Sequence, residues 1–147
     1  MMYMDDDFLE SYDLDWFSSY EDGFLAHFTT GGGSIVPKKV RESIESYELI
    51  YDYFYSLSAS TDIEIIESNL PTFSAQGQRE RYLQSFSNMA ARGLCSYDIS
   101  RDGSGYKLIA KPKSQLKYEH LPEEIKRIIY ILPAGIISNA TVLEKVE

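Results

Sequence analysis

The stretch that most constrains the fold of this chain is a predicted β-hairpin near its N-terminal end. Its two arms are Asp15–Ser19 and Gly23–Thr30, and both are rich in aromatic residues. The turn that joins them, Tyr20-Glu21-Asp22-Gly23, contains Asp-Gly, a dipeptide typical of hairpin turns because both residues tolerate positive φ angles. Alternate side chains of a strand point to opposite faces. In the second arm one face carries Phe24, Ala26 and Phe28, and the other carries Leu25, His27 and Thr29.

A long amphipathic helix is predicted to follow the hairpin, from Pro37 to Leu57. Proline suits the first turn of a helix, where its missing N–H would have no partner. Apolar residues then recur at spacings of three and four, which is the period of one helix face. We expect this aromatic-rich face to pack on the core. Its members are Val40, Ile44, Tyr47, Ile50, Tyr51, Phe54 and Leu57.

The rest of the chain mixes predicted strands and helices. The predicted strands are Leu94–Ser100, Tyr106–Pro112, a closing strand at Ile136–Val146, and Asp62–Glu67 as a short strand or an extended linker. The predicted helices are Ser74–Arg92, which Gly93 is placed to end, and a shorter third helix that starts near Pro122 and is ended by Leu132-Pro133-Ala134-Gly135. No repeated strand–helix–strand rhythm is present. The expected fold is therefore α+β, a single domain over 1–147 in which antiparallel β-hairpins pack with about three α-helices.

Negative charge is concentrated at the start of the chain. The formal net charge is −9, and the residues before Lys38 contribute −8 of it because they include no Lys or Arg. Eight acids precede Lys38, and five of them lie in an acidic lead-in at 1–13. The eight are Asp5, Asp6, Asp7, Glu10, Asp13, Asp15, Glu21 and Asp22. Such a field repels nucleic acid and anionic membranes and attracts basic surfaces. We treat these acids as candidate partner-binding residues; the alternative is a solvated terminus that aids solubility.

The sequence also indicates where the protein works. The first ten residues, MMYMDDDFLE, lack the basic start and apolar core of a secretory signal. No apolar run approaches the ~20 residues of a membrane span. The single cysteine, Cys95, can form no internal disulfide, which fits a reducing compartment. We expect a cytoplasmic protein that binds neither membrane nor nucleic acid, since its aromatic residues are not interleaved with Lys and Arg.

Three consecutive glycines, Gly31-Gly32-Gly33, lie between the predicted hairpin and helix, in the order of a phosphate-binding loop. A Walker loop requires a lysine that this segment lacks, and Val36 occupies the third glycine position of a dinucleotide fingerprint. Pro37 removes a backbone donor from the helix start. We expect a turn whose glycines adopt positive φ. The alternative is a small-ligand- or nucleotide-binding domain, or a small enzyme, that uses the Gly31–Ser34 loop.

No catalytic or metal-binding constellation is evident. One cysteine and two histidines are too few for a closed zinc site, and Phe17 occupies the third ligand position of a calcium-loop pattern. His27 is expected to be a partly buried structural residue, His120 to shape the start of the third helix, and Cys95 to be a core residue. An Asp/Glu pair acting as general acid and base stays open, because nothing marks out one pair. We expect no catalytic residue, no metal and no cofactor.

Several short motifs follow one another: Asp15-Trp16-Phe17, Asp22-Gly23, Ala26-His27-Phe28-Thr29-Thr30-Gly31-Gly32, Val36-Pro37 and Tyr53-Phe54-Tyr55-Ser56-Leu57. In this order the chain resembles the opening of small bacterial immunity proteins from polymorphic-toxin and contact-dependent competition systems. Ala110-Lys111-Pro112 and Leu121-Pro122-Glu123-Glu124-Ile125 are similar to later segments of such proteins. The resemblance covers residues 13–57 and, less closely, 106–130.

The resemblance implies a function without chemistry. Proteins of this family bind and neutralise a cognate toxin in the cytosol by protein–protein contact, and they have no catalytic residues to carry over. The expected partner is therefore a protein toxin. An acidic inhibitor gains association rate toward a basic toxin by electrostatic steering, but the charge does not identify the toxin. The oligomeric state stays open.

Overall fold

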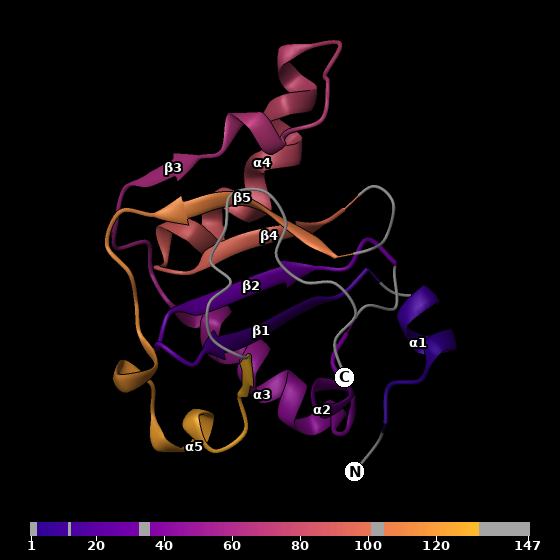
Figure 1. Cartoon of the computed structure of the whole chain (residues 1–147), viewed down its shortest axis with the longest axis vertical. Coiled ribbons are helices and arrows are strands. Elements are labelled where there is room, and N and C mark those ends of the chain that lie inside the picture. The colour runs from indigo at the N-terminus through magenta and orange to yellow at the C-terminus, as the bar shows by residue number, and fades with distance from the viewer. Residues whose placement is uncertain (1–2, 12, 33–35, 101–104, 133–147) are drawn as a thin grey trace.

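The computed structural model describes residues 3–11, 13–32, 36–100 and 105–132, which form a six-stranded mixed sheet with two main helices and several short ones (Figure 1). The strand order is β3-β5-β4-β2-β1-β6. The strands are β1 (Asp15–Tyr20), β2 (Leu25–Thr29), β3 (Ile63–Ile65), β4 (Cys95–Ile99), β5 (Tyr106–Pro112) and β6 (Tyr130–Leu132). The helices are α1 (Asp6–Ser11), α2 (Lys38–Arg41), α3 (Ile44–Ser56), α4 (Gln76–Ala91) and α5 (Glu123–Lys126), with 3-10 turns at η1 (Glu67–Asn69) and η2 (Tyr118–His120). The predicted α+β class is confirmed.

The predicted N-terminal hairpin is present as β1 and β2. These strands pair antiparallel, with Asp15 opposite Thr29 and Ser19 opposite Leu25. At the turn, the Asp22 carboxylate accepts a hydrogen bond from the Phe24 N–H at 3.2 Å, and Gly23 adopts a φ of 95°. The Asp22-Gly23 pair therefore makes the turn by the chemistry that its residue types predict.

The two hairpins join into one sheet through a parallel pairing that the sequence did not indicate. β4 and β5 form the second antiparallel hairpin, and β4 lies parallel to β2 at the centre of the sheet. At one edge, β6 runs parallel to β1. The sheet is therefore mixed rather than wholly antiparallel.

The predicted helix over residues 37–57 is interrupted, and the prediction of one continuous helix is wrong at Ser43. This residue has an extended backbone, and its hydroxyl accepts a hydrogen bond from the Ser46 N–H at 3.1 Å. Serine is a favoured N-cap because its oxygen satisfies a backbone donor that the first helical turn leaves free. The cap starts α3 anew after the single turn of α2.

Both long helices cover the same face of the sheet, behind the strands in Figure 1. On α3, the buried residues are Ile50 and Phe54, and the ring of Phe54 stacks on Phe17 of β1 at 4.8 Å. On α4, the buried residues are Leu83, Phe86, Met89 and Ala90. The predicted helix at 74–92 is thus confirmed with slightly shorter bounds.

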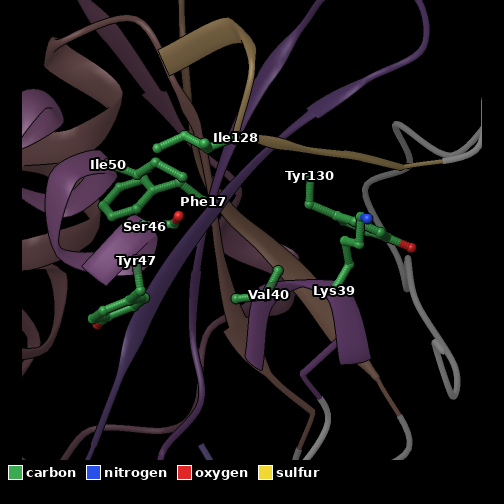
Figure 2. A pocket seen from close by; sticks show the side chains of 8 residues that line it. All are labelled: Phe17, Lys39, Val40, Ser46, Tyr47, Ile50, Ile128 and Tyr130. Atoms are coloured by element: carbon green, nitrogen blue, oxygen red, sulfur yellow. The ribbon is translucent and has the colours of Figure 1, made fainter. Parts of the chain in front are cut away.

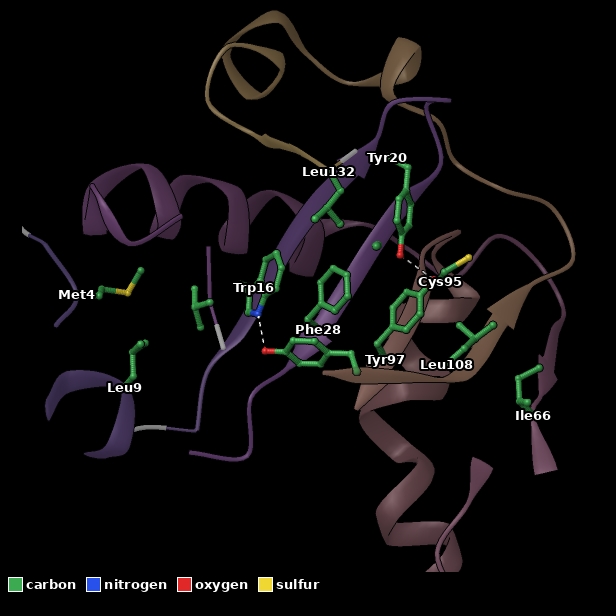
Figure 3. Packing of buried hydrophobic residues seen from close by; sticks show 13 residues of the cluster. Met4, Leu9, Trp16, Tyr20, Phe28, Ile66, Cys95, Tyr97, Leu108 and Leu132 are labelled. Carbon is green, nitrogen blue, oxygen red and sulfur yellow. Dashed lines mark hydrogen bonds between the residues drawn. The ribbon is translucent and has the colours of Figure 1, made fainter. Parts of the chain in front are cut away.

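The opposite face of the sheet is a stack of aromatic rings (Figure 3). Phe28 lies between Trp16 at 4.2 Å and Tyr97 at 4.8 Å, both in stacked orientation. The polar atoms of these rings find partners inside the core: Trp16 Nε1 donates to the Tyr106 hydroxyl at 3.1 Å, and the Tyr20 hydroxyl donates to that of Tyr97 at 3.0 Å. Each of these four polar side chains therefore has a hydrogen-bond partner inside the core.

The predicted third helix is much shorter than expected. It comprises only α5, and residues 130–132, expected as its end, form β6 beside Ser18, Ser19 and Tyr20 of β1. Pairing with an otherwise open sheet edge satisfies backbone groups that an isolated short helix would leave exposed. The predicted closing strand at Ile136–Val146 lies outside the described residues. No helix in the described ranges has the length and apolar character needed to cross a membrane.

Gly93, which was predicted to end the second helix, follows α4 with a φ of 103°. A β-carbon at this position would lie 2.7 Å from Leu116 Cβ and 2.8 Å from the Leu116 backbone N. We predict that Gly93→Ala lowers the free energy of unfolding by about 2–4 kcal/mol, because it adds steric overlap to a strained φ. Gly23→Ala is the matched control: its φ is 95° but no atom lies within 4 Å, so the expected loss is only about 1 kcal/mol. Urea unfolding of both variants measures the difference, and equal losses would contradict the role of Leu116.

Phe54 is fully buried between α3 and the sheet. We predict that Phe54→Ala lowers the free energy of unfolding by about 3–5 kcal/mol, because it removes a ring from a packed core. Tyr53→Ala is the control, since Tyr53 is only partly buried on the same helix and should cost less. Chemical denaturation followed by far-UV circular dichroism checks both values. A Phe54→Ala protein of unchanged stability would show that the ring is not part of the core.

Candidate functional site

The candidate site is an open groove between the start of β1 and one side of α3, with a volume of about 530 Å³. Its lining combines four carboxylates with two tyrosine rings and one leucine. The lining residues are Asp13, Leu14, Asp15, Tyr47, Glu48, Tyr51 and Asp52. Among the residues that the structure describes, no basic side chain lines it. The groove therefore has the charge and the aromatic surface to receive a positively charged group.

Helix geometry explains how α3 supplies its half of this lining. Residues four positions apart lie on the same side of a helix, so Glu48 aligns with Asp52 and Tyr47 aligns with Tyr51. All of α3 lacks Lys and Arg. Both Glu48 and Asp52 are exposed, and in the described part of the chain neither side chain makes a hydrogen bond or ion pair. Their charges are therefore available to a partner.

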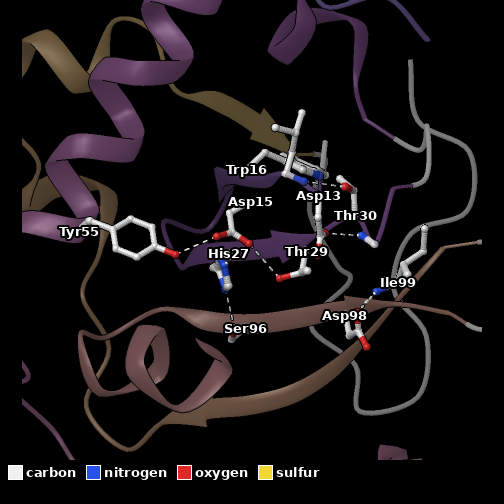
Figure 4. Close-up of polar contacts among 12 residues, drawn as sticks. Asp13, Asp15, Trp16, His27, Thr29, Thr30, Tyr55, Ser96, Asp98 and Ile99 are labelled. Atoms are coloured by element: carbon white, nitrogen blue, oxygen red, sulfur yellow. Dashed lines mark hydrogen bonds and ion pairs between the residues drawn. The ribbon is translucent and has the colours of Figure 1, made fainter. Parts of the chain in front are cut away.

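The carboxylate of Asp15 anchors the sheet side of the groove (Figure 4). Thr29 Oγ1 donates to Asp15 Oδ1 at 3.1 Å, and the Tyr55 hydroxyl donates to Asp15 Oδ2 at 2.8 Å. His27 Nε2 lies 3.3 Å from Oδ1, close to the carboxylate, although the pair does not have the geometry of a hydrogen bond. The carboxylate thus connects β1, β2 and α3.

These contacts change the ionisation of Asp15. Burial alone would raise its pKa, but the His27 imidazole and the hydroxyls of Tyr55 and Thr29 outweigh that effect and hold the pKa below its usual value. The same carboxylate, together with burial, raises the pKa of Tyr55, which therefore stays protonated as a donor. At neutral pH the groove has a fixed negative charge at its base.

Asp15, His27 and Ser96 form a row with the residue types of a hydrolase triad. His27 Nδ1 lies 2.6 Å from Ser96 Oγ, with the imidazole between the serine and the carboxylate. However, His27 and Ser96 have no exposed surface, so no substrate reaches the serine oxygen in this arrangement. The row links β1, β2 and β4 across the sheet, and His27 is the structural histidine that was expected, although fully rather than partly buried.

The eight predicted partner-binding acids do not form one patch. Asp5 accepts a hydrogen bond from the Phe8 N–H at the start of α1, and Asp6 pairs with Arg41 at 2.9 Å. Asp7 and Glu10 also lie in α1, where Asp7 is exposed. Only Asp13 and Asp15 of the eight line the groove.

The remaining two predicted acids, Glu21 and Asp22, lie at the opposite end of β1 from the groove. A strand of six residues separates them from Asp13 and Asp15, a length of about 20 Å. Sequence reasoning missed Glu48 and Asp52 because it followed the charge of the first 37 residues. The signal that could have found them is a pair of acids four apart in a helix without bases.

The glycine loop is already occupied by a carboxylate of the chain itself. Gly31 and Gly32 have φ angles of 58° and 81°, as expected for a turn. The Gly31 N–H donates to Asp13 Oδ1 at 3.0 Å, and this carboxylate would repel a phosphate at the same donor. Residues 33–35 lie outside the described residues.

A second cavity beside α3 offers little room, and the buried Cys95 offers little reactivity. The cavity, between β1, α2, α3 and β6, encloses about 20 Å³, enough for about one water molecule, and Figure 2 shows its largely apolar lining. Cys95 is buried as expected, and burial raises the pKa of its thiol to about 11, so it is not a thiolate at neutral pH. His120 accepts a hydrogen bond from the Lys117 N–H and closes η2 just before α5.

Within the described ranges, no three His, Cys, Asp or Glu side chains are grouped closely enough to hold a metal ion. No family model matches this chain, and no curated protein or solved structure does either. The chemistry of the groove is the basis on which a function can be proposed.

The ionisation of Asp15 gives a stability prediction with a definite sign. Because the folded-state pKa is lowered, the ionised carboxylate stabilises the protein above the unfolded pKa of about 3.9, and this contribution is lost as pH falls through the folded value. We predict that Asp15→Asn is less stable than the unsubstituted protein at pH 7. The difference should shrink progressively between about pH 5 and pH 2.

The control is Asp98→Asn. Burial raises the pKa of Asp98, so acidification should favour the unsubstituted protein over this variant, which is the opposite trend. Urea unfolding at a series of pH values measures both differences. A difference for Asp15→Asn that stays constant with pH would contradict the lowered pKa.

Proposed function

We propose that this protein is a cytoplasmic inhibitor of the immunity type, which binds a cognate bacterial toxin and neutralises it by protein–protein contact. The observation that carries the proposal is the groove between β1 and α3, where four carboxylates, including the exposed Glu48 and Asp52, lie beside two tyrosine rings, with no basic residue among the described residues of the lining. Tyrosine is enriched in the energetically dominant parts of protein interfaces. The resemblance of residues 13–57 to immunity proteins agrees with this use.

The construction of the groove suits an inhibitor. A partner is bound more tightly when the surface that receives it is already ordered, because less conformational entropy is lost on binding. Here one wall is the start of β1, a strand that is paired on both sides, with β2 and β6, and the other is a helix of 13 residues. Asp15 ties the two walls together through Tyr55. The groove is thus held in shape before a partner arrives.

The charge distribution supports a basic partner. The acids of α1 and those of the groove have the same sign, and the chain as a whole has a net charge of −9. Summed over a surface, such charges raise the association rate of a basic protein and repel acidic ones. The alternative function, a ligand site at the Gly31–Ser34 loop, is less well supported because Asp13 already binds the Gly31 N–H.

The test uses the product of the neighbouring gene as the toxin candidate. The two proteins should co-purify, and the inhibitor should abolish the toxicity of its partner in cells. We predict that the quadruple variant Asp5→Asn, Asp6→Asn, Asp7→Asn, Glu10→Gln slows association several-fold at low salt while changing dissociation little, because exposed charges act through long-range steering. The effect should fade as salt shortens the Debye length from about 30 Å at 0.01 M to about 3 Å at 1 M.

The control for this variant removes the same number of charges elsewhere. Asp62→Asn, Glu80→Gln, Glu119→Gln and Glu124→Gln together change four exposed acids outside α1 and the groove. Stopped-flow kinetics at low and high salt compares the two. An association rate equally affected by both sets would mean that only net charge matters. A rate unaffected by the first set would show that the acidic lead-in serves solubility.

A further inference from the structure

The groove lies beside a row of tyrosines that already holds a cation from this chain. Tyr47, Tyr51 and Tyr55 follow one another at four-residue spacing on α3, and the rings of Tyr51 and Tyr55 are stacked at 4.3 Å. The guanidinium carbon of Arg92 lies 5.8 Å from the centre of the Tyr55 ring. That separation is within the range of a cation–π contact, so the last ring of the row has a guanidinium partner.

The other two rings have no such partner among the described residues, but they have carboxylates beside them. Tyr47 and Tyr51 line the groove together with Glu48 and Asp52, whose side chains make no ion pair in the described part of the chain. A cation placed on this part of the row would meet ring surface on one side and carboxylate oxygens on the other. Those are the two kinds of contact that a guanidinium makes best.

We propose that the groove between β1 and α3 is the docking place of an arginine side chain from the partner protein, with the guanidinium against Tyr47 and Tyr51 and between the carboxylates of Glu48 and Asp52. This inference rests on the proposed function and names the contact that would give it specificity. The four groove carboxylates provide the charge complementarity that selects a cation. The rings of Tyr47 and Tyr51 favour a planar cation.

Arginine fits this groove better than lysine for two physical reasons. An ammonium is a compact point charge that stays strongly hydrated, whereas a guanidinium is flat, weakly hydrated and able to stack on a ring. The groove has a volume of about 530 Å³, which exceeds what one ammonium fills, and no three of its described carboxylates are grouped closely enough to hold a metal ion. A planar donor with five N–H groups can reach separated acceptors.

The first experiment uses the protein alone and a small probe. N-acetyl-arginine amide is titrated into isotopically labelled protein, and amide shifts are followed by NMR. The expected result is weak, saturable binding, roughly millimolar, with shifts clustered at Glu48, Tyr51 and Asp52, and weaker binding of N-acetyl-lysine amide. Equal binding of the two probes, or shifts spread evenly over all acidic residues, would overturn the proposal.

A double variant of the groove carboxylates and the single variant Tyr51→Phe sharpen this test, because both should keep the fold. Glu48→Gln with Asp52→Asn should weaken the arginine probe roughly 3- to 10-fold, while the matched pair Asp62→Asn with Glu119→Gln, also exposed, should leave it unchanged. Tyr51→Phe keeps the ring and should keep the binding. Loss of binding in Tyr51→Phe would show that the hydroxyl rather than the ring makes the contact, and would overturn the stacked arrangement.

The second experiment separates this inference from the proposed function. In the complex with the toxin, Glu48→Gln with Asp52→Asn should raise the dissociation rate, because a charge pair enclosed by an interface acts mainly on that rate. A toxin that binds both this variant and the unsubstituted protein equally well would refute the groove as its arginine site and leave the inhibitor function standing. Absence of any toxin binding, with the probe still bound in the groove, would refute the inhibitor function instead.

Discussion

The register between β1 and β2 is the constraint on which the rest of the structure depends. Both faces of this pair are buried: one carries the Trp16–Phe28 stack of the first core cluster, and the other packs against α3 and α4. A shift by one residue would exchange the two faces and place His27 among the aromatic rings of the first core. The same register puts Asp15 opposite Thr29, and so brings its carboxylate to His27 and Tyr55.

Stability and the candidate site share this carboxylate. Asp15 lies between a buried histidine and the groove, and its donors come from β2 and α3. Such a group is stabilised as an anion because three neighbours compensate for its partial loss of water. The core therefore helps to maintain the negative charge that the groove presents, and the surface of α3 adds two carboxylates that need no internal partner.

Much of the fold was predictable because its elements have local causes. The Asp22-Gly23 turn, the apolar period of α3 and the glycine after α4 each act within a few residues. The parallel pairing of β2 with β4 was not predictable from local sequence, because it joins segments about 70 residues apart and depends on both helices covering one face. The strand β6 was not predictable either, since its three residues adopt a strand conformation only because they pair with the edge of β1. The break at Ser43 was locally encoded but was outweighed by the longer apolar pattern.

The candidate site, like the fold, could be predicted from the sequence only in part. Charge depends on composition alone, so the acidic start of the chain and the candidacy of Asp13 and Asp15 could be derived from the sequence. Tyr47 and Tyr51 were expected in the core, yet they line a groove, and Tyr55 was expected off the buried face, yet it binds Asp15. The sequence by itself determined which side chains have charge and which faces are apolar. Only the tertiary structure decided which of them meet, because distance along the chain does not report distance in space once a helix packs across a strand.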